Sequence, residues 1–263
     1  MRPTYLRCLA LLLSTFYSLH SMADEVTIVS DRWYPFNGIP NAPDPGYMIE
    51  MARYGLSRGG HTLNYQIMSW QNSMDLVRQG KKNCIVGAYK SDAPDFIYSQ
   101  QHQAVDRMAF YIRADEAWHY QKSDSLHNKR LGVINGYAYQ RELDIYIANN
   151  TNDSQVKKAK GKYALENNLL DLIAGRLDVV LGSEIVIERT LKKQHWQQQI
   201  QLADYATPPS KIYIACSPKL PSSIAYLELI NQGIEELRST GQLQSLLMKY
   251  QMTDWHGIEA LDQ

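Results

Sequence analysis

The sequence predicts an α/β fold in which a parallel sheet is covered by helices. Three observations lead to this prediction. Apolar runs of strand length alternate with segments whose apolar residues recur at helical spacing. Glycines follow several of the predicted helices, where a left-handed residue ends a helix well. The same order of strand, loop and helix begins again near residue 130.

The first strand and helix organise the amino-terminal part of the chain. Residues 26–30 form a short run rich in β-branched side chains, and residues 48–52 carry apolar side chains at helical spacing. The loop that follows the strand, residues 31–36, contains an acid and several aromatics. Ligands of open α/β sheets bind beyond the carboxyl ends of strands, so this loop is the first candidate for a site.

The remaining elements repeat this pattern in two groups. The first group comprises a strand at 61–67, a helix at 70–78 closed by Gly80, and strands at 83–89 and 108–112. A polar stretch at 113–129 separates it from the second group. That group comprises a strand at 130–134, helices at 140–148 and 163–174, and a strand at 177–182. A strand at 211–216, a long helix ending near Arg238 and a last helix at 242–250 complete the chain.

Residues 1–23 resemble a secretory signal peptide. Arg2 and Arg7 form a basic start, residues 8–16 are apolar, and Ser21–Met22–Ala23 resembles a cleavage site with small residues. A transmembrane anchor would need about 20 unbroken apolar residues, and Ser14, Ser18 and His20 interrupt this stretch. We therefore expect an exported protein that begins at Asp24 and resides in the periplasm.

Composition and charge exclude several classes of protein and partner. The 263 residues are 44% hydrophobic and 21% charged, which is globular and excludes disordered and fibrous proteins. The chain has 27 basic and 27 acidic residues, and removal of Arg2 and Arg7 leaves a net charge of about −2. Such a balance gives no reason to expect a nucleic-acid partner, and it is compatible with a monomer.

Six segments carry a resemblance to a known family. They are Asp31 with Tyr34–Pro35–Phe36, Gly–Tyr–Met–Ile–Glu–Met–Ala at 46–52, Gly80 before Cys–Ile–Val–Gly at 84–87, Leu–Gly–Val at 131–133 with Gly136, Leu–Ile–Ala–Gly–Arg–Leu–Asp–Val–Val at 172–180, and Ile–Glu–Glu–Leu–Arg–Ser–Thr–Gly at 234–241. In this order they resemble the family 3 extracellular solute-binding proteins, which serve uptake of polar amino acids. The resemblance covers nearly all of the mature chain.

The resemblance implies a two-lobe type II periplasmic binding protein fold with a ligand cleft between the lobes. Lobe 1 would comprise residues 24–111 and 210–263, and lobe 2 residues 112–209. Two hinge crossings would lie near residues 106–112 and 205–211. On this template the strands holding Cys84 and Cys216 run side by side, so a disulfide between these two cysteines becomes possible; two small buried thiols are the alternative.

The resemblance also implies where a ligand would bind. Family positions that line the cleft correspond to the following residues of this chain: Asp31, Trp33, Tyr34, Trp70, Gly87, Tyr89, Lys90, Ser91, Tyr137, Tyr139, Ser183 and Glu184. Core packing is the alternative for each aromatic, since the chain has 18 tyrosines.

Two departures from the family change the expected ligand. Binders of α-amino acids usually place an Arg after the third strand, where it takes the carboxylate in two hydrogen bonds; here residues 90–94 contain none. The Asp that usually takes the ammonium corresponds to Ser183. Lys90 or Arg107 could replace the Arg, and Glu184 the Asp. A cationic, aromatic or peptide-like solute is therefore as compatible with this sequence as an amino acid.

The leading hypothesis is a periplasmic binding protein that delivers a small solute to the permease of an ABC transporter. The alternative is a receptor that docks on a periplasmic sensor domain. An enzyme is not expected: Glu184, Asp31 and Glu142 could act as acids or bases, but each is explained more simply as a hydrogen-bond acceptor or a solvated charge. No phosphate loop, metal-ligand spacing or Ser–His–Asp pattern is recognisable, so no cofactor and no metal are expected.

Overall fold

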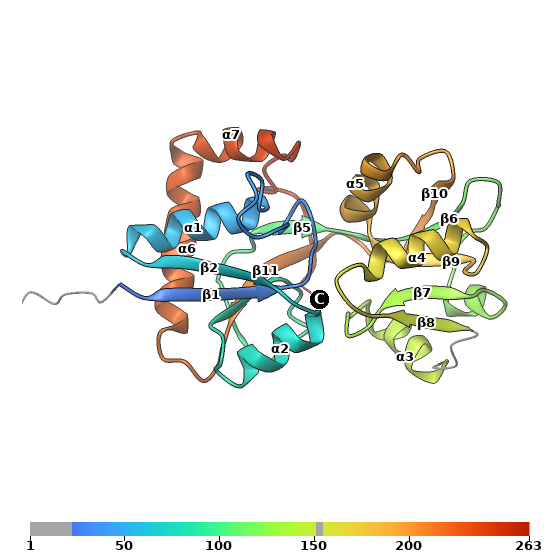
Figure 1. The fold of residues 1–263 in the computed structure, drawn as a ribbon, viewed down its shortest axis with the longest axis horizontal. Coiled ribbons are helices and arrows are strands. Elements are labelled where there is room, and N and C mark those ends of the chain that lie inside the picture. The colour runs from blue at the N-terminus through green and yellow to red at the C-terminus, as the bar shows by residue number, and fades with distance from the viewer. Residues whose placement is uncertain (1–22, 151–154, 263) are drawn as a thin grey trace, which may run out of the picture.

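The computed structural model describes residues 23–150 and 155–262, which form two lobes, each built on one β-sheet (Figure 1). The predicted signal peptide lies outside the described residues except for Ala23. Among the described residues, no helix has both the length and the apolar character required to cross a membrane.

The first sheet has the strand order β2-β1-β3-β11-β4, and β5 also pairs with β11. β1 is parallel to β2 and β3, whereas β11 is antiparallel to β3, β4 and β5. The bounds of these strands are β1 (Glu25–Ser30), β2 (Thr62–Ile67), β3 (Cys84–Ala88), β4 (Ile97–Tyr98), β5 (Ala104–Asp106) and β11 (Ser210–Cys216).

The second sheet has the order β10-β6-β9-β7-β8. β7 is parallel to β8 and β9, and β6 is antiparallel to β9 and β10. The bounds are β6 (Met108–Arg113), β7 (Leu131–Ile134), β8 (Val156–Ala159), β9 (Val179–Ser183) and β10 (Ile200–Tyr205).

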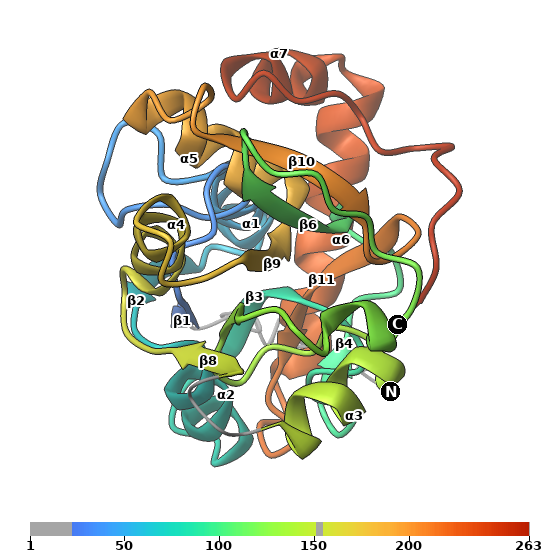
Figure 2. The ribbon, with the colours of Figure 1, turned by 90° about the vertical axis from the view of Figure 1, so that its right-hand side faces the viewer.

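Helices cover both sheets. The first lobe contains α1 (Tyr47–Arg58), α2 (Trp70–Arg78), α6 (Ser223–Ser239) and α7 (Gln242–Lys249), with α1 and α2 on opposite sides of β1 (Figure 1). The second lobe contains the short 3₁₀ helix η1 (Ser123–Leu126), α3 (Arg141–Asn149), α4 (Ala164–Ile173) and α5 (Glu184–Gln194). Figure 2 faces this lobe, and both views place α3 and α4 on opposite sides of β8.

Helices α1 and α6 approach each other backbone to backbone. A Cβ atom added to Gly55 would lie 2.6 Å from the Cα of Ile230, and one added to Gly233 would lie 2.5 Å from the Cα of Gly55. Only glycine avoids a collision at these two positions, because a backbone atom cannot move aside as a flexible side chain can. This close approach therefore fixes the position of α6 against α1.

The chain passes between the lobes twice. Arg107 alone separates β5 from β6, and residues 206–209 separate β10 from β11. The boundary between lobe 1 and lobe 2 was predicted after residue 111, which lies inside β6. Residues 108–111 pair with β9 in the second sheet. We therefore assign β6 to the second lobe and place the boundary at Arg107. The predicted second boundary, between residues 209 and 210, lies at the start of β11.

A disulfide joins Cys84 of β3 to Cys216 of β11. These two residues face each other in the antiparallel register, and both are fully buried. The bond therefore links the amino-terminal and carboxyl-terminal segments of the first lobe inside its core.

Candidate functional site

The candidate site lies between the lobes, where loops that follow β1 and β3 face loops that follow β7 and β9. We call its innermost part the inner pocket. Six of the twelve predicted ligand residues line it, namely Asp31, Trp33, Trp70, Gly87, Tyr89 and Tyr137. Its volume is about 10 Å³, close to the space that one water molecule needs. A solute can therefore enter only if the lobes separate.

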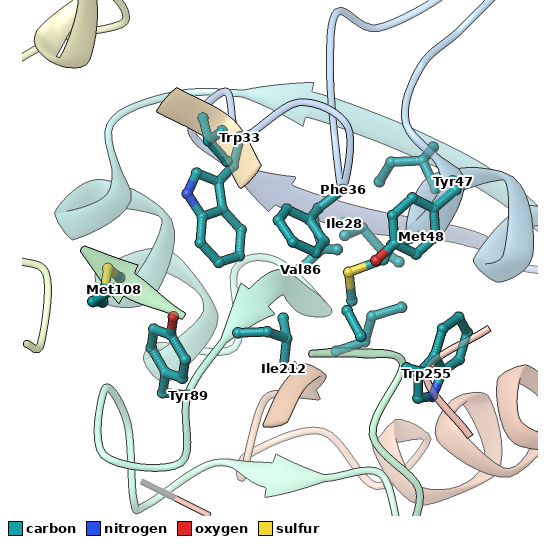
Figure 3. Packing of buried hydrophobic residues seen from close by; sticks show 14 of the residues in the cluster. Ile28, Trp33, Phe36, Tyr47, Met48, Val86, Tyr89, Met108, Ile212 and Trp255 are labelled. Carbon is teal, nitrogen blue, oxygen red and sulfur yellow. The ribbon is translucent and has the colours of Figure 1, made fainter. Parts of the chain in front are cut away.

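Aromatic rings form the walls of the inner pocket. Trp33 stacks on Phe36 with ring centroids 4.5 Å apart, and it meets Tyr89 edge to face at 6.4 Å. Figure 3 places Trp33, Tyr89 and Met108 on the side of the core away from Trp255, with the indole nitrogen of Trp33 pointing away from Phe36. Gly87 has φ +89°, and an added Cβ would lie 3.1 Å from the Trp33 ring. Glycine at this position thus leaves room for the indole.

Asp31 joins the two lobes. The Tyr137 hydroxyl, from the loop after β7, donates a hydrogen bond of 2.6 Å to Asp31 Oδ2. Desolvation in the cleft raises the pKa of Asp31 to about 6, although the bond from Tyr137 acts in the opposite direction. Tyr137 also meets Trp70 edge to face, with centroids 6.1 Å apart.

Asp92 forms a second link across the cleft. Its Oδ2 accepts a hydrogen bond from the backbone N–H of Tyr89 at 2.8 Å, and its Oδ1 accepts one from the backbone N–H of Ala138 at 3.3 Å. Desolvation raises the pKa of Asp92 to about 7, and the negative charges of Asp31 and Asp144 add to this effect. Asp92 lines the inner pocket, which makes it a site residue that the sequence-based set does not contain.

Asp106 ends β5 directly behind the inner pocket and is 2% exposed. The Ser183 hydroxyl donates to its Oδ1 at 2.8 Å, and the Tyr89 hydroxyl donates to its Oδ2 at 3.3 Å. Desolvation raises the pKa of Asp106 to about 7. Ser183 also caps α5, because its hydroxyl accepts the N–H of Val186 at 3.2 Å.

The basic side chains nearest the cleft are held by acids outside the inner pocket. Arg32 forms an ion pair with Glu166 of the second lobe. Arg107 lies 3.0 Å from Glu184, so these two proposed substitutes for the family's charged residues pair with each other. Lys90, the other proposed substitute, lies 3.3 Å from Asp262.

Four predicted ligand residues do not line the inner pocket or its continuation. Lys90 and Glu184 are directed to the ion pairs above, and Ser91 is exposed on the loop after β3. Tyr139 is 1% exposed in the core, where its hydroxyl accepts the N–H of Ile134 at 2.8 Å.

The cleft continues outward from the inner pocket. A middle part is shared by Asp31, Tyr137 and Ser183, and beyond it lies an outer pocket of about 330 Å³ that includes Tyr34. Arg32 and Glu166 line both the middle part and the outer pocket, so their ion pair lies where these two parts of the cleft meet. Within residues 23–150 and 155–262, no group of three or more His, Cys, Asp or Glu side chains is placed to hold a metal ion.

Comparison with known proteins identifies the fold. No family model matches the sequence, and no curated protein does either. Solved structures match over most of their length. An ancestral arginine-binding protein bound to arginine has a TM-score of 0.71 at 17% identity, covering 88% of this chain and 100% of that one. A substrate-binding protein of an ABC uptake transporter from Streptococcus pneumoniae, with bound histidine, has a TM-score of 0.69 at 15% identity, covering 86% and 92%.

A third similar structure comes from a signalling protein. It is a histidine kinase sensor domain with similarity to periplasmic binding proteins, and it has a TM-score of 0.69 at 16% identity, covering 86% of this chain and 96% of that one. These likenesses confirm the predicted two-lobe type II periplasmic binding protein fold.

Proposed function

We propose that this protein is a periplasmic solute-binding protein that captures a small solute between its lobes and delivers it to the permease of an ABC transporter. The observation that carries the proposal is the inner pocket, to which both lobes contribute side chains. Hydrogen bonds cross it from Tyr137 to Asp31 and from Ala138 to Asp92. Such contacts form when the lobes rotate together and break when they part, which suits capture and release of a solute.

The similar structures support this proposal. Two of them belong to a protein that binds arginine and to a transporter protein that binds histidine, and neither is described as an enzyme. The first lobe presents Trp33 and Trp70 to the pocket, and the second presents Tyr137, so both lobes can enclose an organic solute. Proteins with this role act outside the cytoplasm, in agreement with the signal peptide expected at residues 1–23.

A thermal-shift screen of residues 24–263 against small metabolites tests the proposal. A solute at 100 times its dissociation constant stabilises the folded state by about 2.7 kcal/mol. Trp33→Ala should abolish the shift, because Trp33 lines the pocket. Trp118→Ala removes an indole that packs on Phe110 in the second lobe and should keep the shift. Loss of the shift in both variants, or no shift with any solute, would contradict the proposal.

The second candidate is a receptor that reports its solute to a membrane signalling protein, and the histidine kinase sensor domain favours it. Uptake of the labelled solute by cells with and without the gene separates the two functions. Loss of uptake on deletion supports transport, whereas unchanged uptake with an altered transcriptional response supports the receptor.

A further inference from the structure

We infer that the inner pocket selects a small organic cation, an amine that carries no carboxylate group. This inference rests on the proposed solute-binding function and names its class of ligand. Three features carry it: the charge of the pocket, the engagement of its hydrogen-bond donors, and a buried donor that has no acceptor.

The ionisable groups at the inner pocket, tyrosines apart, are all carboxyl groups. Asp31 and Asp92 line it, and Asp106 lies behind Tyr89. None of these three carboxyl groups takes part in an ion pair among the described residues, and their side-chain partners are the neutral hydroxyls of serine and tyrosine. The described residues that line the inner pocket include no lysine, arginine or histidine. A bound cation would stabilise the ionised form of these buried carboxyl groups, whereas a carboxylate would add a further negative charge.

Two backbone donors at the pocket already have acceptors. The N–H groups of Tyr89 and Ala138 both donate to Asp92, so the protein's own carboxylate occupies donors that an anionic group on a solute would need. The guanidinium groups of Arg32 and Arg107 are held by Glu166 and Glu184. An α-carboxylate would therefore lose its hydration in the pocket without gaining a charged partner.

The aromatic walls suit a cation, since the face of an indole or phenol ring attracts positive charge. Trp70 supplies an independent indication of a ligand. It lines the inner pocket, it is 5% exposed, and its indole Nε1 has no hydrogen-bond partner. A buried donor without an acceptor costs free energy, and an uncharged acceptor on the bound solute, such as an imidazole nitrogen or a phenol oxygen, would satisfy it.

Tyr137 indicates how such a solute binds. Its hydroxyl lies on Asp31 Oδ2 and the pocket has almost no free volume, so the solute replaces this hydroxyl when the lobes open and close again. The exchange substitutes a charged N–H donor for a neutral O–H donor on the same carboxylate. Charged hydrogen bonds are the stronger kind.

Matched pairs of solutes that differ only in the carboxylate test the inference by calorimetry. The pairs are agmatine and arginine, cadaverine and lysine, histamine and histidine, and tyramine and tyrosine. We expect at least one amine to bind at least about 100-fold more tightly than its amino acid, which corresponds to about 2.7 kcal/mol.

Two variants of the protein test whether Asp31 is responsible for binding the amine. Asp31→Asn should weaken binding of that amine about 10- to 100-fold, the range of a charged hydrogen bond. Asp95→Asn is the control, because Asp95 is an exposed acid paired with Arg78 outside the cleft. Thermal unfolding of both variants checks that they fold, and the comparison of solute pairs on the unaltered protein does not depend on either variant.

Each outcome has a distinct meaning. If an amino acid binds as tightly as its amine, or if only anionic or neutral solutes from the thermal-shift screen bind, the inference is overturned while the solute-binding function stands. Equal losses in the Asp31 and Asp95 variants also overturn it. If no solute of any class binds, the proposed function fails and the inference fails with it.

Discussion

The two lobes differ in their strongest structural constraints, although both carry surface ion pairs, such as Arg238 with Asp254 in the first lobe and Arg130 with Asp178 in the second. The first lobe is held by a buried disulfide and by a close helix crossing, and its cleft-facing carboxyl groups have raised pKa values. The second lobe is held at its surface by ion pairs, such as Arg130 with Asp178 at 2.7 Å, in which the pKa of Asp178 is lowered to about 2. Covalent and packing constraints thus support the lobe that brings the unpaired acids to the cleft.

The largest change in the free energy of unfolding should come from removal of the disulfide in the first lobe. Replacement of Cys84 and Cys216 by alanine should lower the free energy of unfolding by about 2 to 5 kcal/mol, because the bond closes a long loop, with a sequence separation of 132. Chemical denaturation measures the change, and addition of a reductant to the unaltered protein should reproduce it. A loss below about 1 kcal/mol would show that the core of the first lobe does not depend on the bond.

A change of pH should have a somewhat smaller effect on the free energy of unfolding. The pKa of Asp106 is raised from 3.8 to about 7, so its contribution to stability is complete below pH 4 and is lost as the pH rises through 7. Between pH 5 and 8 this group alone accounts for about 2 to 3 kcal/mol. The contribution of Asp178 has the opposite sign: it is present above pH 4 and is lost as the pH falls towards 2.

Denaturation at pH 5 and pH 8 measures the first of these effects. The unaltered protein should be more stable at pH 5, and Asp106→Asn should reduce the difference, since asparagine does not ionise. Asp178→Asn is the matched control and should leave the difference unchanged. If both variants keep the full pH dependence, the buried carboxyl group is not its source.

The next largest loss of stability should come from a substitution at the crossing of α1 and α6. Gly233→Ala places a Cβ 2.5 Å from the Cα of Gly55, and we expect a loss of about 1 to 3 kcal/mol from overpacking. Gly241→Ala is a control in open space, although its φ of +74° adds backbone strain that any L-residue would share. Equal losses in the two variants would mean that backbone conformation, rather than the crossing, accounts for the effect.

The smallest effect should come from the second lobe. Arg130→Ala removes an ion pair whose arginine side chain is 45% exposed, and such pairs contribute about 0.2 to 1 kcal/mol. Added salt should weaken the contribution further. A loss as large as that of the disulfide would remove the contrast between the lobes.

Much of the fold could be predicted from the sequence because buried strands and amphipathic helices have a local signature. The strands β1, β3, β7, β9 and β11 match predicted segments, and β1, β9 and β11 each extend one residue beyond them. β8 was missed because its sequence, Val–Lys–Lys–Ala, has no alternating pattern of sufficient length. α5 was missed because it follows β9 with no intervening loop, although Ser183 ahead of an apolar run is a signal for a helix start.

The site was only partly predictable. Asp31, Trp33 and Tyr137, expected from the family resemblance to lie in loops after strands, all line the inner pocket. Asp92 and Asp106 could not be singled out, since their raised pKa values arise from desolvation, which depends on both lobes together. The same holds for Glu184 and Arg107, whose mutual pairing removes them from the role that charge alone suggested.

The position of the disulfide also determines how the chain behaves after cleavage. Cys84 precedes the first passage between the lobes and Cys216 follows the second. A protease that cuts the chain within the second lobe would therefore yield two fragments that remain covalently joined. They would migrate as one species until a reductant separates them, and the first lobe would keep both of its segments even if the second lobe were digested.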